Sequence, residues 1–136
     1  MSSLPWLEAG DPFPDIDQAL SDPNGLLAAG ASLTSRQLIK AYSAGIFPWY
    51  EADQPILWWS PNPRSVLLPD QLKISRSLRK KLRSNQFTVS LDTQFDKVIA
   101  ACAGPRAYSD GTWITTDMYN AYVKLHQQGY AHSIEC

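Results

Sequence analysis

The sequence predicts an α+β protein, from two periodic patterns and from its composition. Apolar residues recur at helical spacing in four stretches, at residues 34–44, 74–84, 93–103 and 116–128. Short runs with strand character lie between and after them, at residues 56–60, 64–68, 87–91 and 131–136. Of the 136 residues, 44% are hydrophobic and 18% charged, as in soluble globular proteins. This length suits one domain, or one small domain and part of a second.

The amino-terminal residues carry no recognisable sorting signal. They lack a basic start followed by an apolar run, and no stretch of the chain approaches the ~18 apolar residues of a membrane span. We therefore expect a cytoplasmic location and no membrane partner. The two cysteines are too few for a disulfide framework, and Cys102 is expected to be a free, buried thiol.

Residues 1–33 form an irregular start rich in Pro, Gly and Asp. One short helical candidate covers residues 16–20, and the small apolar run at 26–30 indicates a short buried segment. The helix at 34–44 follows. Thr34 and Gln37 have the spacing of a capping box, in which each side chain bonds the other residue's backbone N–H, and Gly45 marks the helix end.

Residues 45–64 hold two clusters of aromatic residues and proline, at 47–50 and 58–61. Because strand side chains alternate between faces, the adjacent Trp58 and Trp59 must point in opposite directions, so only one can join a given core. An aromatic face that the core does not use suits stacking on a nucleobase, worth roughly 1–3 kcal/mol per base. Packing in a core or against a second domain is the competing interpretation for each tryptophan here.

A local positive patch follows the strand predicted at 64–68. Six of the twelve basic residues lie within eleven positions, and no acidic residue occurs between Gln71 and Leu91, although the net charge of the chain is −1. In the helix at 74–84, Ile74, Leu78 and Leu82 form an apolar stripe opposite the cations. The basic face is either a surface for an anionic partner or merely solvated.

The last third of the chain alternates strands and helices. Asp92 is placed to cap the helix at 93–103, whose predicted buried stripe is Phe95, Val98, Ile99 and Cys102. A polar loop at 106–111 leads to the helix at 116–128, which Gly129 ends.

No residue pattern specifies a reaction. The sequence has no Gly-rich phosphate loop, paired-cysteine zinc pattern or nucleophile elbow. The spacing of His126, His132 and Cys136 matches no common metal site, so we expect no metal. Asp110, Asp117 and Glu135 have no evident partner, so no acid–base pair can be assigned.

Several motifs together resemble the leucyl/phenylalanyl-tRNA–protein transferase family. They are Asp22-Pro-Asn-Gly-Leu-Leu-Ala, Ala41-Tyr42 with Gly45-Ile-Phe-Pro-Trp49, Ile56-Leu-Trp-Trp-Ser-Pro-Asn-Pro-Arg64, Ile74-Ser-Arg-Ser, Gly111-Thr-Trp-Ile-Thr115 and His132-Ser-Ile-Glu135. The resemblance implies a bacterial enzyme that moves Leu or Phe from aminoacyl-tRNA to the N-terminal Arg or Lys of a protein, marking that protein for degradation. It also implies an N-terminal α/β domain at 1–62 and, at 63–136, the first part of an acetyltransferase-like (GNAT-like) mixed sheet with helices.

The resemblance assigns two groups of binding residues. Tyr42, Trp49, Trp113 and Tyr122 would line the site for the 3′-terminal adenosine of the tRNA. The phosphates of the tRNA would meet the basic helix, through Lys73, Arg76, Arg79, Lys80 and Arg83. No cofactor is implied, and the catalytic residues are unknown, because the chain ends about halfway through the family's length.

Two alternatives to an active transferase are a non-catalytic tRNA-docking module and a structural fragment. In the family fold, the strand at 131–136 lies inside a sheet whose next strands come from the part of the family that this chain lacks. We therefore expect this chain alone to be inactive and to self-associate through the unpaired edge. Ile114, Met118, Tyr122 and Ile134 would then be partly uncovered.

Overall fold

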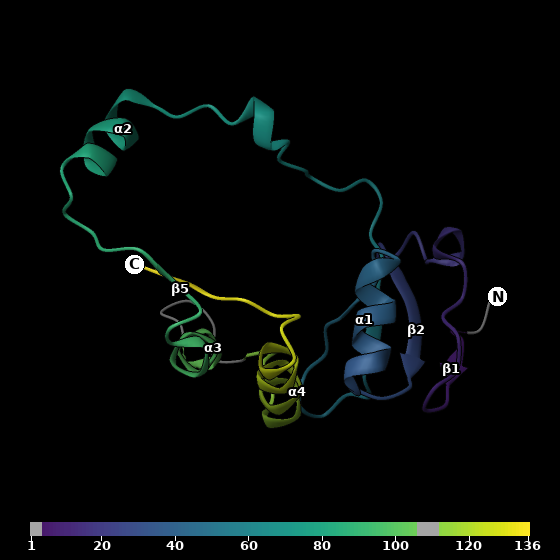
Figure 1. The fold of residues 1–136 in the computed structure, drawn as a ribbon. Coiled ribbons are helices and arrows are strands. Elements are labelled where there is room, and N and C mark those ends of the chain that lie inside the picture. Colours follow the sequence, from purple (N-terminus) through teal and green to yellow (C-terminus); the bar gives the residue numbers. More distant parts are fainter. Residues whose placement is uncertain (1–3, 106–111) are drawn as a thin grey trace.

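The computed structural model describes residues 4–105 and 112–136, so the polar loop predicted at 106–111 lies outside the described residues. Helices and short strands alternate in this part of the chain, which confirms the α+β prediction (Figure 1). In addition to the α-helices, Ile16–Gln18 and Pro69–Gln71 form single 3₁₀ turns. None of the helices in the described ranges is long and apolar enough to cross a membrane.

The amino-terminal half is built on a four-stranded mixed sheet. Its strands lie in the order β1 (Trp6–Leu7), β2 (Leu26–Gly30), β4 (Leu57–Trp59) and β3 (Phe47–Pro48). β1 pairs with β2 in parallel, whereas β2–β4 and β3–β4 are antiparallel. Leu38 and Ala41 of helix α1 (Ser35–Ser43) pack in one buried cluster with Leu27 and Trp58 of this sheet, so α1 covers one of its faces.

Trp58 and Trp59 divide between the two sides of β4, as the alternation predicts. Trp58 is fully buried, its indole N–H donates to the carbonyl of Gly30 at 2.9 Å, and Phe13 meets it edge-on at 4.8 Å between ring centroids. Trp59 remains partly exposed. The core interpretation therefore holds for Trp58.

Only half of the predicted capping box forms at α1. The Thr34 hydroxyl accepts from the backbone N–H of Gln37 at 3.4 Å, but the Gln37 amide donates to the Asp11 carbonyl at 3.1 Å instead of returning to Thr34. The Gln37 side chain is buried, and this long-range bond satisfies it while fixing the irregular start against α1. Gly45, at φ 73°, ends the helix as predicted.

Residues 62–89 leave this sheet and run as an extended detour, the wide arch in Figure 1, to strand β5 of the second half. The strand predicted at 64–68 does not form, and Val66 and Leu67 are 78% and 68% exposed. An apolar run forms a strand only where a partner strand offers hydrogen bonds. Among the described residues, no strand pairs with residues 64–68. Helix α2 (Arg76–Arg83) forms within the predicted 74–84 window, capped by Ser75. Its apolar stripe is exposed, as is its basic face.

Helices α3 (Phe95–Ala103) and α4 (Thr116–Gln127) pack together in the second half of the chain. Strand β5 (Ser90–Leu91) pairs antiparallel with β6 (Ile134–Glu135). A second buried cluster of Tyr50, Ile114 and Met118 joins α4 to the amino-terminal half.

The burial of several residues differs from the predictions. Ile114 and Met118 are buried, at 8% and 0% exposure, because Tyr50 of the first half covers them, whereas Ile134 is 72% exposed as expected. Cys102 is free, as expected, but exposed rather than buried. Within the described residues β6 pairs only with β5, and self-association through its other edge stays a prediction.

Asp92 does not cap α3. It adopts a left-handed conformation (φ 58°), and its carboxylate accepts from the Ser133 backbone N–H at 2.9 Å. The N-cap position is Gln94, whose backbone N–H donates to the Glu135 carboxylate at 3.2 Å. A carboxylate from β6 thus performs the capping that the sequence assigned to a local residue.

Candidate functional site

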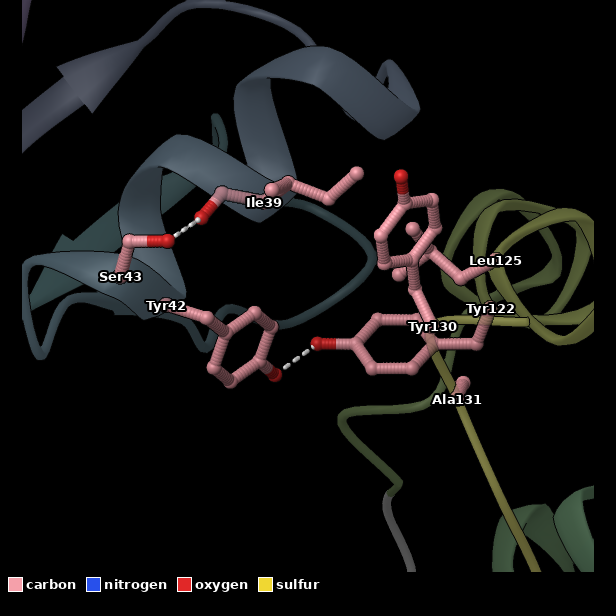
Figure 2. A pocket seen from close by; sticks show the side chains of 7 residues that line it. All are labelled: Ile39, Tyr42, Ser43, Tyr122, Leu125, Tyr130 and Ala131. Atoms are coloured by element: carbon pink, nitrogen blue, oxygen red, sulfur yellow. Dashed lines mark hydrogen bonds between the residues drawn. The ribbon is translucent and has the colours of Figure 1, made fainter. Parts of the chain in front are cut away.

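A pocket of about 430 Å³ lies between helix α1 and the carboxyl-terminal part of α4 (Figure 2). Its wall comprises Ile39, Tyr42 and Ser43 of α1, Tyr122 and Leu125 of α4, and Tyr130 and Ala131 just after α4. The size falls within the roughly 300–1,000 Å³ of small-ligand sites, and aromatic and aliphatic groups predominate in the wall.

Two tyrosines meet across this pocket. The hydroxyl groups of Tyr42 and Tyr122 form a hydrogen bond, and their rings are perpendicular with centroids 6.3 Å apart. Tyr42 extends from α1 and Tyr122 from α4, so residues 80 positions apart in the sequence come into contact. The family resemblance assigned both tyrosines to one site, and in the structure the two are in contact.

The hydroxyl pair is uncharged at neutral pH. Burial raises the pKa of the Tyr42 hydroxyl, and the hydrogen bond from Tyr122 offsets this only in part. Burial, followed by the neighbouring Tyr42, raises the pKa of the Tyr122 hydroxyl still further. In the pair one hydroxyl donates to the other, which leaves one O–H and several lone pairs for a ligand.

Trp49 and Trp113, the other two predicted site residues, do not belong to this pocket wall. Trp49 is 55% exposed at the end of β3, where its ring lies 6.2 Å from that of Trp59. The Trp59 indole N–H donates to the Trp49 carbonyl at 2.7 Å and fixes the backbone there. Trp113 is partly buried against the cluster that contains Ile114 and Met118.

A second, more open hollow of about 920 Å³ lies where residues 31–33 and 50–56 face the start of α4. Tyr50 is buried in its wall, with its hydroxyl 3.5 Å from that of Thr115. The Thr115 hydroxyl also accepts from the Met118 backbone N–H at 3.3 Å and so caps α4. Asp117, which had no evident partner in the sequence, lines this hollow in the first turn of α4.

The predicted phosphate-binding residues lie on the detour. Arg76, Arg79, Lys80 and Arg83 line a shallow hollow of about 480 Å³ on α2, and Lys73 is exposed just before the helix. Within the described residues, none of these five cations forms an ion pair with a carboxylate. Their charge is therefore open to an anionic partner.

Glu135 has partners that sequence reasoning missed. Hydrogen bonds from Ser133 (2.5 Å), Ser90 (2.6 Å) and Thr93 (2.9 Å) reach its carboxylate, together with the Gln94 backbone N–H. These bonds, led by those of Ser133 and Ser90, lower the pKa of Glu135 to about 2. Only Ser133 is close to Glu135 in the sequence, and Ser90 and Thr93 reach it because β5 pairs with β6.

The two histidines share Asp92 as a neighbour, because His126 Nδ1 lies 3.8 Å from the same carboxylate that His132 contacts. His132 Nδ1 is 2.6 Å from the Asp92 carboxylate, a bond that lowers the pKa of Asp92 and raises that of His132. His126 stacks on Phe95 with ring centroids 4.2 Å apart, and its Nδ1 is 2.8 Å from the Ala131 carbonyl. Both histidines therefore tie the segment after α4 to its surroundings.

Sequence reasoning also missed Tyr130. This residue is 63% exposed at the rim of the pocket between α1 and α4. The only local signal was its place directly after Gly129, which ends α4.

Two family profiles match the chain in succession. Residues 31–62 match the leucyl/phenylalanyl-tRNA protein transferase N-terminal domain, and residues 66–136 match leucyl/phenylalanyl-tRNA protein transferase. Curated relatives with the name leucyl/phenylalanyl-tRNA–protein transferase are similar over nearly the whole chain. A protein of Pseudomonas putida is 59% identical over 133 residues, and one of Stutzerimonas stutzeri is 56% identical over 133 residues. Each alignment covers 97% of this chain.

A relative from Aromatoleum aromaticum is 58% identical over 132 residues, again 97% of this chain. The chain spans 56% of that relative and 59% of each of the other two. The matched profiles cover most of the described sequence, including both walls of the pocket. On this evidence the chain belongs to the leucyl/phenylalanyl-tRNA–protein transferase family.

Proposed function

We propose that the chain is the amino-terminal part of an enzyme that transfers Leu or Phe from aminoacyl-tRNA to the N-terminal Arg or Lys of acceptor proteins. The transfer marks the acceptor for degradation by the N-end rule, in the bacterial cytoplasm. The observation that carries this proposal is the pocket closed by Tyr42 and Tyr122, in a chain that belongs to the family.

The proposed reaction requires the protein mainly to position its two substrates. The ester that joins an amino acid to tRNA is already activated, so an uncharged amine held close to its carbonyl can attack it. Orientation of two reactants can lower a barrier by several kcal/mol, up to about 7–11 in favourable cases. The reaction needs no covalent enzyme intermediate and no cofactor, and the catalytic residues are not assigned.

The pocket supports a role in holding the end of the tRNA. We propose that the 3′-terminal adenosine is bound by Tyr42 and Tyr122 in the pocket and by Trp49 and Trp113 outside its wall. Aromatic rings hold an unpaired base by stacking, and the free tyrosine O–H and lone pairs suit polar groups of a nucleoside. The 55% exposure of Trp49 leaves one of its faces open to a base.

The exposed cations of α2 support binding of the tRNA backbone. In this proposal Lys73, Arg76, Arg79, Lys80 and Arg83 meet phosphates and add affinity that is independent of sequence. A non-catalytic tRNA-docking role would use the same cations and the same pocket, so the two candidates must be separated by activity.

We further propose an N-terminal domain at 1–62 and part of a GNAT-like domain at 63–136. The two profile matches, at 31–62 and 66–136, support a boundary at this position, as does the point where the detour leaves the sheet. The α1–α4 pocket then lies between the two domains.

A transfer assay tests the proposal. The chain is incubated with tRNA charged with labelled leucine and a peptide beginning with Arg, and a peptide beginning with Asp serves as control. The assay is run with the chain alone and with the chain extended by the remaining part of a close relative. Transfer by the extended protein to the Arg peptide only is the expected result. If the extended protein binds tRNA but transfers nothing, the docking role is correct instead.

A further inference from the structure

Tyr130 is an exposed aromatic residue that the core does not use. It is 63% exposed, yet it lines the pocket with Tyr42 and Tyr122. In Figure 2 its ring stands next to Tyr122, on the α4 side of the pocket and across from Ile39 of α1. The two sides of the pocket therefore present flat or branched apolar surfaces to each other.

The backbone holds Tyr130 in a defined position. Two hydrogen bonds close the end of α4, from the Gly129 N–H to the His126 carbonyl and from the Tyr130 N–H to the Leu125 carbonyl, both at 2.9 Å. This is the Schellman arrangement, which requires a left-handed residue at the position of Gly129, here at φ 79°. In that arrangement the residue after the glycine packs toward the residue five positions before it. Tyr130 and Leu125 accordingly share the pocket wall.

The next residue is fixed as well. The Ala131 carbonyl lies 2.8 Å from His126 Nδ1, and His126 is itself stacked on Phe95 of α3. The backbone of Tyr130 is thus anchored on both sides, so the direction in which its side chain leaves the chain is set in advance of any ligand. A backbone that is ordered beforehand loses less entropy on binding, which favours affinity.

We propose that Tyr130 is a third aromatic contact of this pocket, which stacks on the adenine ring of the bound adenosine. The inference rests on the proposed function for the identity of the base, and on the structure for the position of the ring. Tyr42 and Tyr122 provide the polar floor of the site, and Tyr130 provides the flat wall at its mouth. Gly129 is a positioning residue in this arrangement, because its left-handed conformation directs the Tyr130 side chain toward the pocket.

Binding of adenosine 5′-monophosphate to the purified chain, followed by calorimetric titration, tests the proposal. Ribose 5-phosphate, which lacks the base, is the comparison ligand. Tyr130→Leu removes the ring but keeps an apolar side chain, and it should weaken binding of the nucleotide about 5- to 150-fold, the range of base stacking. Binding of ribose 5-phosphate should not change. Tyr130→Phe keeps the ring and should bind the nucleotide like the unaltered chain.

Gly129→Ala tests the positioning. A Cβ at Gly129 meets nothing within 4 Å, so only its φ of 79° opposes the substitution. Gly10→Ala is the matched control, because Gly10 also has a positive φ (95°) and open space around its Cβ, but lies outside the pocket wall. Gly129→Ala should weaken nucleotide binding more than Gly10→Ala does.

The outcomes separate the inference from the function on which it rests. If Tyr42→Ala weakens nucleotide binding and Tyr130→Leu does not, the role of Tyr130 is overturned and the proposed adenosine site stands. If the unaltered chain binds the nucleotide no better than ribose 5-phosphate, the adenosine site itself is wrong, and Tyr130 has no base to stack on. Circular dichroism of each variant confirms that the fold is retained, as the exposure of Tyr130 leads us to expect.

Discussion

Trp49 and Trp58 show that chemically identical side chains in one short segment can have opposite roles. Trp58 is fully buried and hydrogen-bonded to Gly30, whereas Trp49 leaves more than half of its surface in solvent. The difference follows from β3–β4 pairing, in which Pro48 is opposite Trp58 and Trp49 continues past the end of the strand. The core therefore depends on Trp58, and Trp49 is free for a ligand.

We expect Trp49→Ala and Trp113→Ala each to weaken binding of the adenosine end by about 1–3 kcal/mol while the protein stays folded, because stacking surface is lost. Titration with adenosine 5′-monophosphate and a thermal melt measure the two effects. Trp58→Ala is the control, and it should destabilise the fold by roughly 3–5 kcal/mol, as large core truncations do. Unfolding caused by either of the first two changes would assign that tryptophan to the core.

Glu135 makes the stability of the protein sensitive to acid. Hydrogen bonds from Ser133 and Ser90 lower its pKa from the ordinary 4.5 to about 2 in the folded state. The unfolded chain therefore binds a proton at higher pH than the folded chain does. The stabilisation is complete above about pH 4.5 and is lost as the pH falls from there toward 2.

Urea unfolding between pH 2 and 7 tests this effect (the interval spans the two pKa values of Glu135). The Glu135→Gln variant should have a smaller free energy of unfolding than the unaltered protein at neutral pH. Its free energy of unfolding should also decrease less as the pH is lowered. The control is Glu51→Gln, a change at an exposed carboxylate, which should not alter the pH dependence of the free energy of unfolding. If the Glu135→Gln protein had the same pH dependence as the unaltered protein, the Glu135 carboxylate would not form the hydrogen bonds that the structure shows.

At the scale of the element, helix α2 can lose its charge without loss of packing. Every residue from 62 to 89 is exposed, so substitutions on α2 affect its partner and not the core. Within the described residues its cations have no carboxylate partner to lose. This makes α2 the clearest place to measure the phosphate contribution.

Arg76→Glu combined with Lys80→Glu should weaken binding of every tRNA alike and reduce the salt dependence of binding, because fewer counterions are released. Each lost phosphate contact lowers the slope of log K against log salt by about 1. Filter binding at several salt concentrations measures that slope. The control is Lys97→Glu combined with Lys124→Glu, at exposed positions of α3 and α4, which changes the net charge by the same amount. An unaltered slope in the α2 variant would exclude phosphate contacts there.

The helices were easier to predict than the strands. Helices α1, α3 and α4 carry their own hydrogen bonds, so apolar spacing in the sequence was enough to find them. The strand expected at 64–68 needed a partner that the local sequence cannot specify. The cap of α3 failed for the same reason, because it comes from Glu135, 41 positions away from Gln94. The pair Tyr42 and Tyr122 came from the family resemblance, while Tyr130 required the fold.

At the scale of the whole molecule, the two halves are joined by packing as well as by the chain. Tyr50 covers Met118 in one buried cluster, and Leu125 of α4 belongs to the cluster that contains Leu38 of α1. The detour at 62–89 adds nothing buried to either cluster. The halves should therefore stay together when the detour is cut.

Brief digestion with trypsin tests this expectation. We expect the first cuts at the cations of α2, before cuts at Arg36 and Lys40, because α1 is packed on the core and α2 is not. The two large fragments should elute together on gel filtration under native conditions and separate in urea, with cut sites read by mass spectrometry. Fragments that separate without denaturant would show that the interface between the halves is too weak to hold them.

The contact between Tyr42 and Tyr122 also sets an order of events during synthesis. The strands of the first sheet lie within residues 6–59, so they can pair as soon as that segment has left the ribosome. The pocket cannot exist at that stage, because its second wall is translated only at residues 122–131. Closing the 80-residue separation between the tyrosines costs entropy that local contacts do not. A nascent chain therefore folds its sheet before it acquires any place to hold a ligand.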